Sequence, residues 1–342
     1  MLALTVQREA AGCAVALREL PEPSGDDGDI LVETLAVGVC GTDREIAGGR
    51  VARPPDGRDW LIIGHESLGR VLEAPSGSGL VPGDLVTGVV RRPDPVPCQF
   101  CAMGQPDMCE NGRYTERGII GRDGFASERF RIEPGDADRV DPALGLAGVL
   151  VEPASVVIKA WEQLDRAARR PHRRALVLGA GPIGLLAAML GVQRGLEVHV
   201  VDRAGCGPKP RQARALGAMY HTCPEDVTGT YDAVLECCGE LISEAIASTA
   251  PAGAVCLVSG DRDLGATISL AGLSHDLVHR NKMIIGTVNS NRHHFQAAQE
   301  ALLRADRGWL EGLLTDRVPL REWRSAFTIN PEQVKTVIQF LA

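Results

Sequence analysis

The chain has 342 residues, a length typical of two domains, with 44% hydrophobic and 23% charged residues. Its formal net charge of −8 argues against a nucleic-acid partner, because phosphate backbones attract clustered Lys and Arg. The one basic run, residues 166–174, is interpreted as a solvated linker with a helix end.

The N-terminal segment lacks the charged start and uninterrupted apolar core of a secretion signal. No apolar stretch is long enough to predict a membrane span, so we expect no membrane partner. Without a secretion signal, the ten cysteines indicate reduced thiols and metal ligands rather than disulfides. We therefore expect a cytoplasmic protein.

Residues 1–155 have the pattern of a β-rich domain. Alternating runs at 30–35 and 69–73 predict strands, which clusters of Gly, Pro and Asp interrupt. The stretch 91–113 predicts a loop, because it combines prolines with three cysteines.

After residue 171 strands alternate with helices, which predicts an α/β fold with βαβ units and a parallel sheet. The final fifty residues are expected to return to the first domain, with helices near 293–305 and 331–341. The expected strands of the sheet are 175–178, 196–201, 231–236, 254–258 and 283–288, with helices at 185–193 and 209–216.

A Gly-Ala-Gly-Pro-Ile-Gly turn joins the first of these strands to its helix and predicts a dinucleotide site. Gly179 permits the tight turn, Gly181 lets the backbone approach a pyrophosphate, and Gly184 lets helix and strand pack closely. Pro182 and Ile183 open the helix, whose N-terminus attracts phosphate. The alternatives are a turn without a ligand and a methyltransferase, which the flanking strand and helix disfavour.

The next strand ends at Asp202, which is positioned to accept hydrogen bonds from both ribose hydroxyls of NAD. Its charge would repel the 2′-phosphate of NADP. Three nearby cations, Arg203, Lys209 and Arg211, are able to bind that phosphate instead. We expect NAD, with NADP as the alternative cofactor.

Metal-ligand residues occur in three segments of the first domain. A catalytic zinc takes three protein ligands and keeps one position open. Cys40 and His65, with either Glu66 or Glu152, supply such a set.

The motifs CGTD at 40–43, GHE at 64–66 and GAGPIG at 179–184 resemble the zinc-dependent medium-chain alcohol dehydrogenase superfamily. The resemblance implies a GroES-like β-rich catalytic domain over 1–160, completed by 292–342. It also implies a doubly wound parallel-sheet Rossmann domain over 161–291, and an active site in the cleft between the two.

The same resemblance assigns roles at the active site. It implies Cys40 and His65 as zinc ligands. Glu152 matches the position where polyol and sugar dehydrogenases carry a glutamate. Glu66 is an adjacent carboxylate that can bind the metal or dissociate from it. It implies that Thr42 relays the proton of the substrate hydroxyl, with Glu66 or Glu152 as an alternative base.

Longer segments, among them CGTDREI, GRYTERGIIGRDGF and GTVNSNRHHF, resemble the glucose 1-dehydrogenase subgroup. In that subgroup Glu116, Glu152, Asn289 and Asn291 would lie near the sugar and the nicotinamide. Polyhydroxylated substrates need such donors and acceptors. The alternative for Glu116 is a surface carboxylate beside its neighbouring arginines.

Cys98, Cys101 and Cys109 match the last three ligands of the superfamily's structural zinc. Pro95 replaces the first, and Asp94 beside it is the expected fourth ligand. The alternative is a lobe without metal that carries three free thiols. Two weaker substitutes for the fourth ligand are Asp107 and Glu110.

These residues together predict an aldose 1-dehydrogenase that uses Zn²⁺ and NAD and releases a lactone. The first alternative is a dehydrogenase of a polyol, a cyclitol or a biosynthetic sugar. The others are a zinc-free reductase of enones or quinones, and a catalytically silent dinucleotide-binding protein. The resemblance also implies a homodimer or homotetramer joined through the strand at 283–288.

Overall fold

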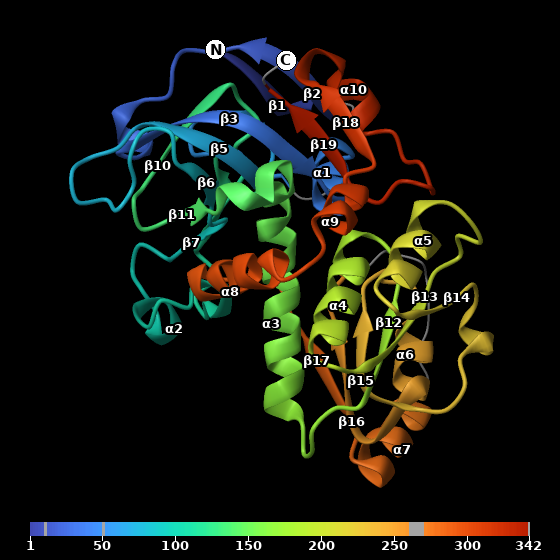
Figure 1. Ribbon diagram of the computed structural model, residues 1–342. Coiled ribbons are helices and arrows are strands. Elements are labelled where there is room, and N and C mark those ends of the chain that lie inside the picture. Colours follow the sequence, from blue (N-terminus) through green and yellow to red (C-terminus); the bar gives the residue numbers. More distant parts are fainter. Residues whose placement is uncertain (10–11, 50–51, 260–269, 341–342) are drawn as a thin grey trace. The chain divides into compact units, whose positions relative to one another are not determined.

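The computed structural model describes residues 1–9, 12–49, 52–259 and 270–340, and the chain divides into two compact units (Figure 1). The first unit contains Met1–Ser155, Asn289–Ile329 and Lys335–Ala342. The second unit contains Val156–Val288 and Asn330–Val334.

The first unit is built mainly from antiparallel strands. Its largest sheet has the order β11-β6-β5-β3-β19-β18, with β10 also paired to β3, and a smaller sheet has the order β2-β1-β4. The strands are β1 (Leu2–Glu9), β2 (Gly12–Glu19), β3 (Ile30–Val39), β4 (Trp60–Ile62), β5 (Glu66–Glu73), β6 (Leu85–Gly88), β10 (Arg129–Ile132), β11 (Ala137–Val140), β18 (Asp316–Pro319) and β19 (Thr336–Gln339). The strands expected at 30–35 and 69–73 are confirmed as parts of β3 and β5.

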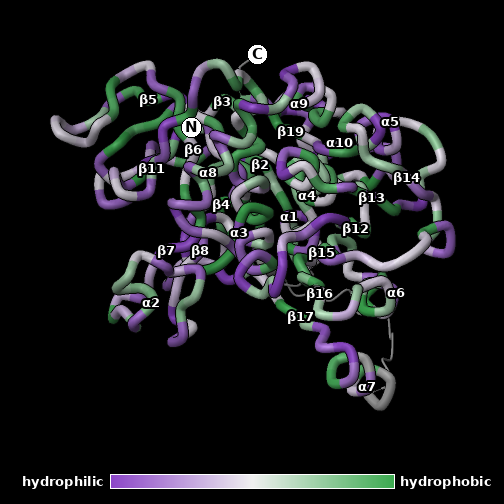
Figure 2. The backbone as a smooth tube through the Cα atoms, turned by 60° about the horizontal axis from the view of Figure 1, so that its bottom comes forward, coloured by the Kyte–Doolittle hydropathy of each residue, from purple (hydrophilic) through white to green (hydrophobic). Residues whose placement is uncertain are grey.

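A third, small sheet in the order β7-β8-β9 carries buried charges. Figure 2 draws the β7–β8 region in the hydrophilic colour, in contrast to the apolar strands β16 and β17 of the second unit. The small sheet consists of β7 (Arg91–Arg92), β8 (Thr115–Arg117) and β9 (Gly121–Arg122).

Short helices connect the strands of the first unit. The expected helix near 293–305 is confirmed as α8. The helices are η1 (Gly25–Asp27), α1 (Gly41–Ala47), α2 (Gln99–Ala102), η2 (Pro106–Met108), η3 (Pro142–Leu150), α3 (Val151–Ala167, which continues into the second unit), α8 (Arg292–Leu303), α9 (Arg307–Leu313), η5 (Leu320–Glu322) and α10 (Trp323–Ala326).

The helix expected at 331–341 is wrong, because this segment contains strand β19 (Thr336–Gln339). Three successive β-branched residues, Thr336, Val337 and Ile338, are buried there. They fit a pleated strand better than a helix. β19 pairs antiparallel with β3 and parallel with β18, so the sheet satisfies the backbone of this strand on both sides.

The second unit is a six-stranded parallel sheet in the order β14-β13-β12-β15-β16-β17. This order reverses between β12 and β15, which is the place where doubly wound sheets bind nucleotides. The five strands expected from 175 to 288 are confirmed as β12 (Arg174–Leu178), β13 (Glu197–Val201), β15 (Tyr231–Glu236), β16 (Thr249–Leu257) and β17 (Met283–Gly286). The sixth strand, β14 (Met219–His221), was not expected.

Helices flank this sheet in two pairs, since α4 packs against α5 and α6 against α7. Right-handed crossovers place the two pairs on opposite faces. The strands are therefore apolar almost throughout, and Leu176, Val201 and Val234 are nearly inaccessible. Each such side chain contributes about 1.5–3 kcal/mol by leaving water. The helices are α4 (Pro182–Gln193), α5 (Pro208–Ala215), η4 (Pro224–Asp226), α6 (Ile242–Ser248) and α7 (Leu270–Arg280).

Among the described residues, one helical stretch, Pro142–Ala167, is long and apolar enough to cross a membrane by length and composition. The expectation that no stretch reaches that length was therefore wrong. Within this stretch, an 18-residue segment has a mean hydropathy of 1.6 and is 72% buried inside the protein, as in the core helix of a folded domain. Gly145 also interrupts the stretch, because its φ of 52° is not helical.

Candidate active site

Three potential metal ligands meet in the first unit. The ligand atoms of Cys40, His65 and Glu66 all lie within 4.8 Å of one another. Cys40 precedes α1, His65 precedes β5, and Glu66 is the first residue of β5. The Sγ atom of Cys40 is 3.1 Å from Nε2 of His65. Sulfur, imidazole nitrogen and carboxylate oxygen in one cluster suit zinc, so the residues present fit this metal.

Asp43 orients the histidine of this cluster. Its Oδ1 atom lies 3.4 Å from Nδ1 of His65, and its Oδ2 atom accepts a 2.9 Å hydrogen bond from the Cys40 N–H. Burial opposes ionisation of Asp43, but His65 and the Cys40 N–H outweigh it and hold the pKa of Asp43 below its usual value. Burial likewise disfavours the imidazolium, yet Cys40 and Asp43 raise the pKa of His65 well above its usual value. A carboxylate on the far nitrogen turns Nε2 toward the metal position, a role that the sequence motif did not assign.

Lys335 is a buried counter-ion of Glu66 that sequence reasoning missed. Its Nζ atom forms an ion pair with Oε2 of Glu66, and the two side chains are 0% and 2% exposed. Gly38 on β3 makes room for this pair, since an added Cβ would lie 2.0 Å from Oε2 of Glu66 and 2.8 Å from Cε of Lys335. The available signal was a lysine directly before the three successive β-branched residues of β19.

Glu152 and Thr42 lie on helices of the same unit. Glu152 is in the first turn of α3 and is 7% exposed. Burial raises the pKa of Glu152 to about 7; Glu66 adds to this effect, and His65 opposes it. Glu152 is outside the group of three mutually close ligands, so Glu66 is the carboxylate that the structure places with Cys40 and His65. Thr42 is half-buried in the first turn of α1.

Glu116 and Asn289 contact each other, although β8 and the segment after β17 are far apart in sequence. Nδ2 of Asn289 donates a 2.7 Å hydrogen bond to Oε1 of Glu116, and Nε of Arg91 donates to the same oxygen at 2.9 Å. Glu116 is thus a buried carboxylate paired with Arg91, so the surface position considered for it is wrong. Asn289 has a φ of 59°, a conformation that Asn tolerates better than most residues.

Asn291 caps helix α8 with its side chain. Its Oδ1 atom accepts the N–H of His293 at 3.0 Å, and its Nδ2 atom donates to Oδ1 of Asp107 at 3.0 Å. Both polar atoms therefore have protein partners within the first unit.

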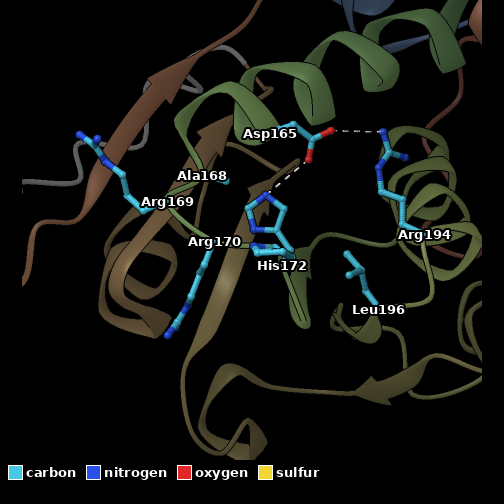
Figure 3. A pocket seen from close by; sticks show the side chains of 8 residues that line it. Asp165, Ala168, Arg169, Arg170, His172, Arg194 and Leu196 are labelled. Carbon is cyan, nitrogen blue, oxygen red and sulfur yellow. Dashed lines mark ion pairs between the residues drawn. The ribbon is translucent and has the colours of Figure 1, made fainter.

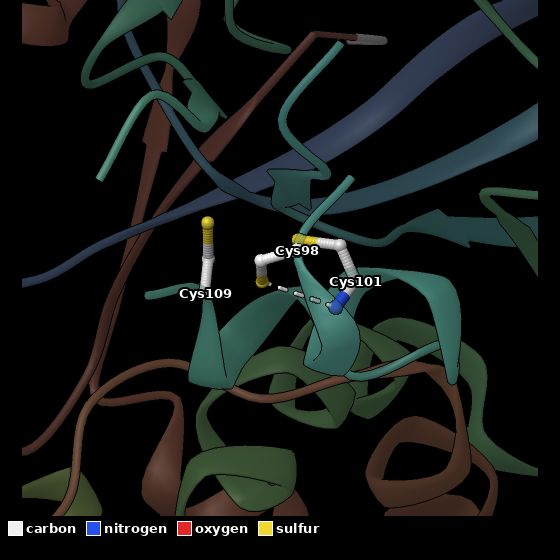
Figure 4. Close-up of side chains that lie close together, drawn as sticks. All are labelled: Cys98, Cys101 and Cys109. Atoms are coloured by element: carbon white, nitrogen blue, oxygen red, sulfur yellow. Dashed lines mark hydrogen bonds between the residues drawn. The ribbon is translucent and has the colours of Figure 1, made fainter. Parts of the chain in front are cut away.

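A second potential metal cluster contains Cys98, Cys101 and Cys109, whose sulfur atoms lie within 4.8 Å of one another (Figure 4). Cys98 caps α2, Cys101 lies in that helix, and Cys109 ends η2. Backbone N–H groups, first that of Cys101 and then that of Glu110, lower the pKa of Cys98 to about 7. Burial raises the pKa of Cys101 to about 11.

The structure does not bring Asp94 into this cysteine cluster. Its Oδ2 atom accepts a 3.1 Å hydrogen bond from Nε of Arg113, and its Oδ1 atom accepts the Val96 N–H at 2.8 Å. The expectation of Asp94 as the fourth ligand is therefore corrected. The physical reason is that the proline-rich turn folds the carboxylate back onto its own backbone, where an arginine neutralises it.

We expect this cluster to bind a second zinc more weakly than Cys40 and His65 bind the first, because structural sites normally use four protein ligands. Elemental analysis should give two zinc ions per chain in excess zinc and one after mild chelation. A Cys109→Ser variant should contain one zinc under both conditions while the turnover rate changes little. A wild-type chain that never exceeds one zinc would reject the second site.

The glycine turn of the second unit has the geometry that a pyrophosphate requires. Gly179 has a φ of +98°, and a Cβ on Gly184 would lie 1.8 Å from the Gly179 carbonyl oxygen. At Gly181, the N-cap of α4, an added Cβ would meet no described atom within 4 Å. No described protein atom explains the glycine at this position, but a phosphate bound at the helix N-terminus would, because a Cβ there would obstruct it. The turn therefore fits a dinucleotide.

Two residues expected to select the cofactor follow β13. Asp202 is 15% exposed at its side chain. Arg203 is 89% exposed and lies 3.6 Å from Glu240 as an ion pair.

Residues 168–172 of the basic run line a hollow of about 580 Å³ in the second unit (Figure 3). Acidic groups neutralise part of its charge. Nε2 of His172 lies 3.5 Å from Oδ1 of Asp165, and Arg170 pairs with Asp232 at 2.8 Å. These ion pairs fit the interpretation of the run as a solvated connection.

The antiparallel unit with its cysteine–histidine–glutamate cluster and the sheet in Rossmann order together define a medium-chain alcohol dehydrogenase. Residues 26–139 match the family model of the alcohol dehydrogenase GroES-like domain, and residues 145–340 match that of the glucose dehydrogenase C-terminus. The chain therefore belongs to the glucose dehydrogenase family within these zinc-dependent enzymes.

Individual relatives are similar over nearly the whole chain. Glucose 1-dehydrogenase of Methanocella arvoryzae is 38% identical over 340 residues, with 94% of each chain covered. The enzyme of Thermoproteus tenax is 36% identical and covers 95% of this chain and 96% of its own. A solved structure of Haloferax mediterranei glucose dehydrogenase in complex with NADP, Zn and gluconolactone has a TM-score of 0.88 and 33% identity, with complete coverage of both chains.

Proposed function

We propose that this protein is a zinc-dependent aldose 1-dehydrogenase that oxidises a glucose-like sugar at C1 to the lactone and reduces NAD or NADP. The Cys40–His65–Glu66 cluster carries the proposal, in a chain that aligns end to end with a glucose dehydrogenase solved with gluconolactone. The cluster supports oxidation of an alcohol, and the relatives support a sugar as the alcohol.

Cys40 and His65 would hold the zinc, and Glu66 or Glu152 would complete the ligand set. When bound, zinc polarises the sugar hydroxyl and the nicotinamide accepts hydride from C1. With zinc bound, Asp43 would accept the Nδ1–H of His65 and so leave the Nε2 lone pair for the metal. Lys335 compensates the charge of Glu66, and this ion pair weakens the binding of that carboxylate to the metal.

The proton of the sugar hydroxyl needs an acceptor. Thr42 is the relay that the family resemblance implies. Glu152 is a second acceptor, because its pKa of about 7 lets it change protonation state near neutral pH.

Sugar recognition is assigned to Glu116 and Asn291, while Asn289 is assigned to the cofactor side of the site. The described hydrogen bonds of Glu116 reach only its Oε1 atom, so Oε2 can accept a sugar hydroxyl. Arg91 and Asn289 fix the carboxylate that presents this oxygen. Asn291 would act mainly by placing α8, since both of its polar atoms contact protein.

We also propose a homodimer or homotetramer that works in the cytoplasm. β17 is an edge strand of the parallel sheet, and Val288 after it is 61% exposed, as an edge-to-edge interface would require. All ten cysteines are free thiols, which fits a reducing compartment.

A substrate panel tests the proposed activity. Glucose and related aldoses should reduce the cofactor and release a lactone that NMR identifies. Polyols and cyclitols should react far more slowly. The matched control is 1,5-anhydroglucitol, which keeps the ring hydroxyls but lacks the anomeric one and should not react. Faster turnover of a polyol or cyclitol than of every aldose would replace this proposal by the alternative of a secondary-alcohol dehydrogenase.

A further inference from the structure

Asp107 joins the cysteine lobe, residues 98–109, to the chain segment that follows β17. It lies in the short helix η2, between Cys101 and Cys109 in the sequence, and it is 4% exposed. Its Oδ1 atom accepts a 3.0 Å hydrogen bond from Nδ2 of Asn291. Asp107 is not in the group of mutually close cysteine ligands, so its position indicates a task other than metal binding.

The backbone of Asp107 also binds the arginine that fixes Glu116. Nη1 of Arg91 donates a 3.1 Å hydrogen bond to the carbonyl oxygen of Asp107. The same guanidinium donates through Nε to Oε1 of Glu116 at 2.9 Å, and its Cζ atom lies 3.8 Å from the centroid of the Tyr114 ring. Arg91 and Glu116 are both buried, which strengthens the charged contact between them because little water competes for it.

The segment after β17 reaches the same carboxylate. Nδ2 of Asn289 donates a 2.7 Å hydrogen bond to Oε1 of Glu116, and Asn291 is two residues further along the segment. Two donors therefore hold Oε1 of Glu116. Asp107 binds one of them, Arg91, and it binds the segment that carries the other. A displacement of Asp107 would move both donors, and the orientation of the second carboxylate oxygen of Glu116 would change with them.

We propose that Asp107 is a positioning residue for the sugar: through Arg91 and Asn291 it holds Glu116 in the orientation that accepts a sugar hydroxyl. The inference rests on the proposed sugar site and adds a residue that acts on the sugar only through its neighbours. A contact to a ring hydroxyl binds the sugar equally in the ground state and in the transition state. Its loss should therefore raise KM for the sugar and leave kcat nearly unchanged.

The test compares two substitutions of Asp107 in the zinc-loaded protein. Calorimetry measures the binding of glucose to the cofactor-free enzyme, and cofactor reduction gives KM and kcat for glucose. In Asp107→Ala, Kd and KM for glucose should both rise by about tenfold or more, while kcat changes less than about threefold. Asp107→Asn keeps an oxygen acceptor for Asn291, so its Kd for glucose should stay within about threefold of the wild-type value.

Exchanging the two partners of the hydrogen bond tests the link and keeps the helix cap. Asn291→Asp still accepts the N–H of His293 at the start of α8, but it places two carboxylates opposite each other. Glucose affinity should therefore fall as in Asp107→Ala. The double variant Asp107→Asn/Asn291→Asp re-forms the hydrogen bond with donor and acceptor exchanged, at the same total charge, and should recover most of the affinity. A double variant that binds glucose as weakly as Asn291→Asp would overturn the inference.

Glu110→Gln is the matched control, since it removes an exposed carboxylate beside the same lobe and should leave the affinity for glucose unchanged. Unchanged glucose affinity in Asp107→Ala would overturn the inference. So would a loss of the second zinc in Asp107→Asn, because Asp107 would then be a metal ligand. In both cases a wild-type protein that oxidises glucose keeps the proposed function. If the wild type neither binds glucose nor oxidises any aldose of the substrate panel, the proposed function fails and the inference fails with it.

Discussion

Replacing Cys40 or His65 by alanine is expected to remove the catalytic zinc and to lower kcat by about 10³-fold or more. Each variant leaves two ligand atoms where the cluster had three, and it removes one half of the close Sγ–Nε2 pair. The glycine turn lies in the other unit, and its geometry depends on neither residue. Affinity for NAD should therefore persist while zinc content and turnover are lost.

Elemental analysis, steady-state kinetics and NAD titration on the same preparations check this expectation. Cys223→Ala is a suitable control, because Cys223 is a half-buried free thiol that belongs to neither potential metal cluster. It should retain both zinc and activity. Full activity in Cys40→Ala or His65→Ala would reject the catalytic metal site, and a parallel loss of NAD binding would indicate misfolding instead.

Lys335→Met is expected to lower the free energy of unfolding by about 3–5 kcal/mol. The substitution leaves Glu66, which is 2% exposed, without its counter-ion. A buried carboxylate without a partner is far more costly than a buried ion pair or an apolar contact. The loss should appear in urea unfolding of the zinc-free protein, where no metal ion compensates Glu66.

The double variant Lys335→Met/Glu66→Gln separates charge from packing. It removes the stranded charge, so it should recover at least about half of the stability lost in the single variant. Lys335→Arg keeps the cation and should cost less than Lys335→Met. A single variant within about 0.5 kcal/mol of the wild type would show that the ion pair contributes little and that Glu66 finds its compensation elsewhere.

Much of the second unit could be predicted from the sequence, because short segments of neighbouring residues specify its strands and turns. Each strand of the parallel sheet is a short apolar run between turn residues, and the glycine turn needs glycines for reasons that lie within a few residues. Gly184 illustrates this, since its missing side chain is explained by the carbonyl of Gly179 on the same turn. For the same reason, short motifs identified Cys40, His65 and Glu66.

The parts that could not be predicted depend on contacts between distant segments or on the path of a loop. Lys335 resembles any lysine until β19 is placed beside β3, and the same pairing turns an expected helix into a strand. Asp94 has the chemistry of a zinc ligand, but the turn around it directs the carboxylate to Arg113. Asn289 and Glu116 meet although no spacing rule connects them.

The antiparallel pairing of Val39 with Thr336 has a consequence for synthesis of the protein. During translation the six strands of the second unit leave the ribosome together and can fold as one block. The first unit is completed later, since the second half of its central strand β3, residues 36–39, has no partner on one edge until β19 is synthesised; β10 pairs only with residues 30–33 of that edge. Lys335 directly precedes β19, so Glu66 acquires its counter-ion only when that segment has been synthesised. A nascent chain that stalls before this point exposes an unpaired strand edge, which makes it a substrate for chaperones and prone to aggregate.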